Sequence, residues 1–216
     1  MKKLHVFIKL VLISAIISLS PKPSFANGNY VRKLVITKKL NDDFSLVGDI
    51  DYRNDEDRLF RRHYDFGIDY NIKKDLILGA RYRHIYLKAR GEWDLSEQRP
   101  QLQITKKFNG KNLVYEGRIR HDYQIFDGDD KNRTRFRFKI ISNRKLFNLK
   151  PVISDEFYYH INDGRLTQSR FEIGAILPTF SYFTPSLFFR EDIKFDNKNR
   201  QWQADQIAVL RVDVLF

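Results

Sequence analysis

Basic residues at every second position are the feature of this sequence best suited to chemistry. Over positions 133–140 a basic series alternates with one threonine and three hydrophobic residues, and the basic residues are Arg133, Arg135, Arg137 and Lys139. A guanidinium keeps its charge and its planar fork pairs with carboxylates through two hydrogen bonds. A surface of this kind predicts either a cross-linked polar interior or a site that attracts anions.

Acidic residues that could pair with these arginines occur in neighbouring runs. Positions 114–123 place acids and arginines together on one side of a strand-like alternation. Asp155 and Glu156 are adjacent, so a regular strand would turn one of them outward, and a β-bulge could turn both inward. The predicted polar network, with both acids included, consists of Arg118, Arg120, Asp122, Arg133, Arg135, Arg137, Asp155, Glu156 and Arg170.

No residue pattern predicts catalysis, a metal site or a cofactor. The sequence contains no Cys, which excludes thiol catalysis and cysteine-based metal sites. Ser154 and His160 share one segment but lie about 20 Å apart at the rise of a strand, too far to pair. His84 and His121 alternate in phase with aromatic residues. We expect a protein that is not an enzyme and that holds neither metal nor cofactor.

These runs must be β-strands, because only a period of two separates the two faces so completely. The alternation extends from residue 31 to residue 216, with turn-forming residues between the segments. Most segments exceed the five or six residues usual in soluble strands and suit a tilted membrane strand of about 9–11 residues. The predicted strands are 31–40, 44–54, 60–72, 76–88, 98–108, 112–125, 133–142, 149–161, 166–177, 184–195 and 203–216.

The expected turns between these segments alternate between short and long, as in a bacterial outer-membrane barrel. The fold class predicted is all-β, a closed antiparallel transmembrane β-barrel with a polar, charged lumen. Because such barrels usually have an even number of strands, we expect 10 or 12 strands and favour 12. Either segment 31–40 is then not a full wall strand, or residues 89–97 hide another strand.

The first 26 residues predict export from the cytoplasm. Lys2 and Lys3 precede the apolar run Leu10–Leu19, and small residues at Ser24 and Ala26 suit signal peptidase. We therefore expect residues 1–26 to be a cleaved signal peptide and residues 27–216 to form the barrel domain. The net charge of +12 would suit nucleic acid, but export makes nucleic acid an improbable partner.

The last segment carries the most specific signal for an outer-membrane location. Apolar residues at alternate positions end in an aromatic residue, the series Leu210, Val212, Val214 and Phe216. This pattern looks like the signature that the barrel-assembly machinery recognises as an exposed strand edge. The expected partners are outer-membrane lipid and that machinery, and the expected oligomeric state is a monomer.

Several stretches resemble the outer-membrane barrels grouped as domain-of-unknown-function family 2490. They are Lys38–Leu40 before a turn, Leu78–Arg83, Pro151–Phe157, and Asn162–Arg165 followed by Gln168–Phe171. The resemblance covers most of residues 27–216 and depends on the order of these motifs. It implies a barrel fold and an outer-membrane location, and it implies no activity.

Three functions remain open from the sequence. The favoured one is an integral outer-membrane barrel that is structural or forms a narrow, anion-preferring pore for small solutes. A lipid hydrolase or deacylase at the barrel rim is the first alternative. A soluble periplasmic ligand-binding barrel of lipocalin type is the second.

Overall fold

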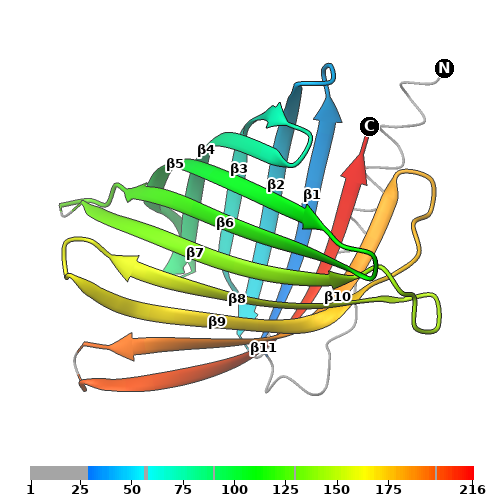
Figure 1. Ribbon diagram of the computed structural model, residues 1–216. Coiled ribbons are helices and arrows are strands. Elements are labelled where there is room, and N and C mark those ends of the chain that lie inside the picture. The colour runs from blue at the N-terminus through cyan, green and yellow to red at the C-terminus, as the bar shows by residue number, and fades with distance from the viewer. Residues whose placement is uncertain (1–28, 56–57, 90, 129, 198) are drawn as a thin grey trace.

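The computed structural model describes residues 29–55, 58–89, 91–128, 130–197 and 199–216, so the predicted signal peptide lies outside the described residues. No helix in this part of the chain is long and apolar enough to cross a bilayer. The described residues form eleven strands in one closed barrel (Figure 1). The strands are β1 (Tyr30–Lys39), β2 (Phe44–Asp55), β3 (Arg58–Lys73), β4 (Leu76–Ala89), β5 (Glu92–Asn109), β6 (Leu113–Gln124), β7 (Lys131–Ser142), β8 (Lys150–His160), β9 (Arg165–Ile176), β10 (Phe183–Asp196) and β11 (Gln201–Leu215).

The barrel closes through a parallel pair, β1 with β11. The register runs from Tyr30 opposite Ala208 to Thr37 opposite Leu215, and β1 also pairs antiparallel with β2. Figure 1 shows β1 in blue beside β11 in red. The predicted fold class is confirmed. The barrel has eleven strands in the described residues, a number between the two expected values of 10 and 12.

The expectation of an even strand number is wrong for the described part of the chain. An odd number of up-and-down strands leaves the first and last pointing the same way, so they can pair only in parallel. Segment 31–40 is a full wall strand. Residues 89–97 hide no further strand, since β4 extends to Ala89 and β5 begins at Glu92.

The expected alternation of short and long connections is also absent. Two of the expected loops are shortened because β2 extends to Asp55 while β3 begins at Arg58, and because β4 and β5 extend towards each other. Connections 143–149 and 177–182 lie at the opposite end of the barrel, beside the C-terminus, and exceed or equal in length the connection 125–130 at the first end. Within 143–149, Phe147 and Asn148 form a tight turn with positive φ, between the predicted strands 133–142 and 149–161.

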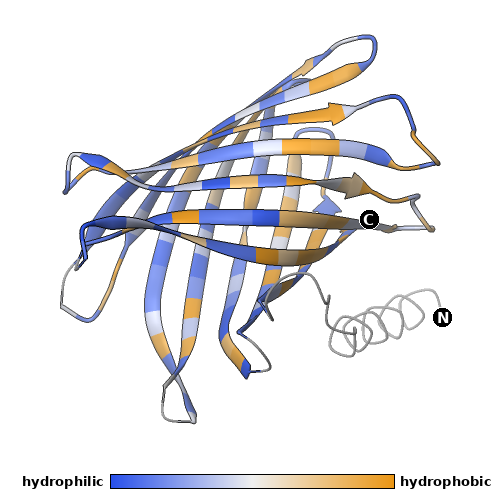
Figure 2. Ribbon diagram, turned by 90° about the horizontal axis from the view of Figure 1, so that it is seen from below, coloured by the Kyte–Doolittle hydropathy of each residue, from blue (hydrophilic) through white to orange (hydrophobic). Residues whose placement is uncertain are grey.

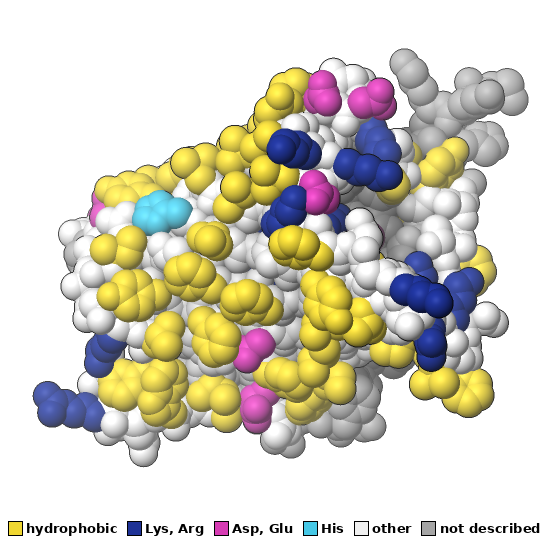
Figure 3. Space-filling view, in the orientation of Figure 1, with side chains coloured by type: hydrophobic (Ala, Val, Ile, Leu, Met, Phe, Trp, Pro, Cys, Tyr) yellow, Lys and Arg dark blue, Asp and Glu magenta, His cyan; other side chains and the backbone are white. Residues whose placement is uncertain are grey.

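Alternating residues give each strand one polar and one apolar face. In Figure 2 the ribbons change repeatedly between hydrophilic and hydrophobic colours along their length. Phe66 and Phe138 point outward and are more than 60% exposed, at 61% and 63%, whereas Asp122 on the inner face is fully buried. Hydrophobic side chains cover much of the outer face visible in Figure 3, with few acidic side chains among them. The predicted orientation of the two faces is therefore confirmed.

Candidate functional site

The lumen holds a cavity of about 410 Å³, within the size range of small-molecule sites. Each of the eleven strands contributes at least one charged side chain to its lining, and basic residues outnumber acidic ones. The basic residues are Lys33, Arg53, Arg81, Arg83, Lys107, Arg118, Arg120, Arg135, Arg137, Lys139, Arg170, Arg190 and Arg211, and the acidic ones are Asp49, Asp51, Asp69, Glu116, Glu156, Glu172 and Asp213.

Four arginines on β6 and β7 form a compact block on the cavity wall. Arg118 lies directly opposite Arg137, and Arg120 lies directly opposite Arg135. Like charges opposite one another on a sheet are destabilising unless other groups compensate them. The arginine block, which we define as Arg118, Arg120, Arg135 and Arg137, therefore needs counter-charges within the lumen.

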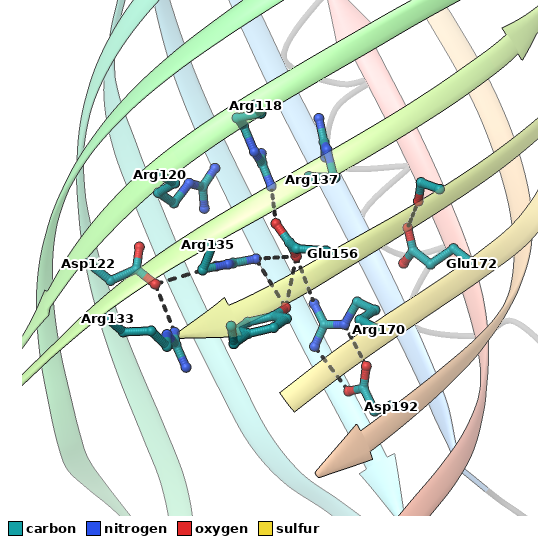
Figure 4. A network of polar contacts seen from close by, with 12 residues as sticks. Arg118, Arg120, Asp122, Arg133, Arg135, Arg137, Glu156, Arg170, Glu172 and Asp192 are labelled. Carbon is teal, nitrogen blue, oxygen red and sulfur yellow. Dashed lines mark hydrogen bonds and ion pairs between the residues drawn. The ribbon is translucent and has the colours of Figure 1, made fainter. Parts of the chain in front are cut away.

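Glu156 on β8 supplies the main counter-charge. Its Oε1 accepts a hydrogen bond from Arg118 Nη2 at 2.7 Å, and its Oε2 accepts one from Arg135 Nη2 at 2.6 Å (Figure 4). The Tyr158 hydroxyl donates to the same Oε2 at 2.8 Å. Arg137 pairs instead with Glu116 of β6. Three members of the block are thus matched with carboxylates.

Arg120 differs from the other three members. Its Nε and Nη2 donate to Gln103 Oε1 at 3.0 and 2.6 Å, so its partner is a neutral amide. Among the residues that the structure describes, no carboxylate forms an ion pair with Arg120. Figure 4 shows its guanidinium beside Arg118 and joined to no acid. The block thus carries four positive charges against the two carboxylates of Glu156 and Glu116, and Arg120 is its member without a carboxylate partner.

Gly79 on β4 makes room for the amide that holds Arg120. It lies opposite Gln103, and a Cβ at position 79 would approach Gln103 Nε2 to 2.8 Å and Asp69 Oδ1 to 2.5 Å. Both contacts are far shorter than van der Waals separations. The glycine thus allows Gln103 to lie flat along the inner wall.

A layer of buried charged side chains on β5, β6 and β7 lies beside the cavity, towards the end that carries the 161–164 turn. Asp122 Oδ2 lies 2.8 Å from Arg133 Nη2 and 3.6 Å from Arg99 Nη1, and Glu97 Oε1 accepts a hydrogen bond from Arg99 Nε at 2.5 Å. We call Glu97, Arg99, Asp122 and Arg133 the ionic layer. All four are buried, and none of them lines the cavity.

A family model for proteins of unknown function, DUF2490, matches residues 32–203. The chain belongs to the DUF2490 family. The family resemblance inferred from the sequence motifs is therefore confirmed, and the matched region includes all of the arginine block and the ionic layer.

One solved structure with the same fold as this DUF2490 barrel is a NanC porin in a rhombohedral crystal form. The two chains superpose with a TM-score of 0.53 at 11% identity, and the match covers 87% of this chain and 92% of the porin chain. At this identity the likeness concerns the fold. No curated protein sequence matches the chain significantly.

The DUF2490 barrel brings most of the predicted network together. Arg118, Arg120, Arg135, Arg137, Glu156 and Arg170 line the cavity, and Asp122 and Arg133 are buried in the adjoining ionic layer. Near the block, Arg170 of β9 lies with Nη1 3.9 Å from Glu156 Oε2 and pairs with Asp192, with Nε 2.5 Å from Oδ1.

Asp155 is the exception, and its predicted place in the network is wrong. β8 alternates regularly at this point, so Glu156 faces the lumen and Asp155 faces outward between Phe138 and Phe171. Ser169 donates a hydrogen bond to Asp155 Oδ1 at 3.3 Å on that outer face. The bulge lies further along the strand, between Tyr158 and Tyr159.

Sequence reasoning missed several lumen residues on β5 and β8. Glu97, Arg99 and Gln103 alternate with outward residues along β5, but the predicted strand begins only at residue 98 and the predicted network contains none of the three. Tyr158 was also missed, although Arg133, Arg135 and Arg170 lie over its ring at 5.0, 4.7 and 5.4 Å. Its alternation with Glu156 was the available signal. In the described residues, no group of three or more acidic or histidine side chains is placed to hold a metal ion.

Proposed function

We propose that the protein is an integral outer-membrane barrel whose lumen forms a narrow passage that prefers small anions. The observation that carries this proposal is the excess of arginine and lysine over acids on the cavity wall, together with the unmatched guanidinium of Arg120. A ring of fixed positive charge lowers the energy of an anion in a confined space and raises that of a cation.

The outer surface supports the membrane location. Aromatic residues on neighbouring strands pack against one another there, for example Phe66 with Tyr82 at 6.1 Å between ring centroids. Exposed aliphatic and aromatic side chains on this face suit contact with lipid. The barrel fold shared with a porin is compatible with this environment.

The ionic layer implies that the passage is narrow. Its buried, ion-paired side chains lie on the lumen wall beside the cavity, and we expect solutes to pass between these charged groups or to displace them. We expect low single-channel conductance rather than the wide aqueous pore of a large barrel.

The test is conductance of refolded protein in a planar bilayer under a potassium chloride gradient. The proposal predicts discrete conductance steps and a reversal potential with the sign of chloride preference. A potassium preference would contradict it.

A barrel that conducts nothing is the second candidate, and the burial of Asp122 and Arg99 favours it. In that case the polar network would only stiffen the wall. Complete absence of conductance from a verified folded barrel would support this structural role over the pore.

A further inference from the structure

We propose that Arg120 is the centre of a binding site for a doubly charged oxyanion, of the kind carried by a small phosphate monoester. This proposal rests on the proposed anion-preferring function and names the kind of anion that the lumen would bind. The anion must be able to enter the lumen to reach Arg120. The other members of the site are Arg118 and Arg137 of the arginine block.

The counter-charges of the block are already used. Glu156 is shared between Arg118 and Arg135, and Arg137 takes Glu116, whose Oε1 also lies 3.6 Å from Lys139 Nζ. Asp122 is two residues from Arg120 on the same face and attracts it, but the two form no ion pair. Asp122 Oδ2 pairs with Arg133 and lies 3.6 Å from Arg99 and from Arg135, and its Oδ1 has no hydrogen-bond partner. No acid on the facing strands is left for Arg120.

The position of Arg120 is fixed before any ligand arrives. The side chain is 6% exposed, and Gln103 Oε1 holds two of its nitrogens. Gly79 leaves the space that Gln103 occupies. A guanidinium anchored in this way loses little freedom when it binds an anion.

The arrangement around Arg120 suits a group with two negative charges. Arg118 is its neighbour along β6, and Arg137 lies directly opposite Arg118 on β7. All three line the cavity, and its volume of about 410 Å³ accommodates a small organic phosphate. Guanidinium groups bind phosphate oxygens through paired, charge-assisted hydrogen bonds. A singly charged anion such as chloride would use only part of this charge.

The experiment is titration calorimetry of the refolded barrel in detergent with inorganic phosphate at about pH 8, where the anion is doubly charged. Three variants each lower the net charge of the lumen by one unit. Arg120→Gln removes the central cation, Gln103→Glu gives that cation a carboxylate partner, and Arg211→Gln is the matched control. Arg211 lines the cavity but is paired with Asp213, at 2.5 Å between Nη2 and Oδ1.

We expect saturable phosphate binding that weakens about tenfold or more in Arg120→Gln and in Gln103→Glu, and less than about threefold in Arg211→Gln. Acetate should bind more weakly than phosphate. Equal weakening in all three variants would show a general charge effect and overturn the site, as would phosphate binding that survives Gln103→Glu. Each variant is first checked for the heat-modifiable gel shift of a folded barrel.

Conductance measurements separate this site from the proposed function. Anion-selective conductance without phosphate binding would overturn the site and leave the pore. Phosphate binding by a barrel without conductance would support the site and contradict the pore.

Discussion

Gly67 on β3 lies so close to β4 that a Cβ at this position would come within 2.1 Å of the carbonyl oxygen of Ala80. Gly174 on β9 has the same relationship with Leu187 of β10, also at 2.1 Å. The atom approached is backbone in both cases, so the neighbouring strand must move to admit a methyl group. Gly117 on β6, by contrast, has nothing within 4 Å of an added Cβ.

We therefore expect Gly67→Ala and Gly174→Ala to lower the stability of the barrel by about 1–3 kcal/mol or more, as overpacking does. Gly117→Ala should stay within about 0.5 kcal/mol of the parent protein. Unfolding by urea in lipid vesicles, followed by tryptophan fluorescence, measures the difference. Equal midpoints for all three variants would contradict the strand separation described.

Asp155 and Glu156 are neighbours with opposite orientations, and only the amide substitution at Glu156 should destabilise the barrel. Glu156→Gln removes the charge that binds Arg118 and Arg135, and leaving buried arginines unpaired costs about 3–5 kcal/mol. Asp155→Asn removes a charge from the outer face, where an acid costs up to about 2 kcal/mol in lipid, so it should be neutral or stabilising. The same urea titration compares the pair. A larger loss for Asp155→Asn would place Asp155, and not Glu156, in the structural network.

The ionic layer should control passage through the lumen. Asp122→Asn leaves Arg133, Arg99 and Arg135 without their shared counter-charge, so repulsion should loosen the layer. We expect lower thermal stability and, if the protein is a pore, several-fold higher conductance. Glu172→Gln is the control, because Glu172 lines the cavity outside the layer and pairs with Arg190. Higher conductance in both variants would indicate a charge effect on ion flow rather than opening of the layer.

Phe216 should matter more for assembly than Leu215. Phe216 packs against the outer apolar cluster of Leu34 and Val214 and lies 5.7 Å from the ring of Tyr182, whereas Leu215 is 50% exposed. A charged residue at 216 should therefore lower the folded fraction in membranes more than the same residue at 215. The heat-modifiable gel shift of Phe216→Asp and Leu215→Asp makes the comparison. Equal folded fractions would contradict the role assigned to the outer face of β11.

Much of the fold could be predicted because it follows from local alternation. Arg135 and Phe136 must face opposite sides of β7 whatever the rest of the chain does, since successive side chains of a strand point to opposite faces. The same rule placed Arg118 and Arg120 in the lumen together. It failed where the alternation carried two acids in succession, because a bulge and a regular strand give different orientations and the sequence contains no marker to separate them.

The sequence by itself determined which side chains share a face, and therefore that the lumen would be charged and the outer surface apolar. Only the tertiary structure decided how the strands meet. The parallel closure of β1 on β11, the outward position of Asp155 and the neutral partner of Arg120 all depend on which residue lies opposite which across strands. That register is set by closure of the whole sheet, and a period-two pattern repeats identically for every shift of two residues.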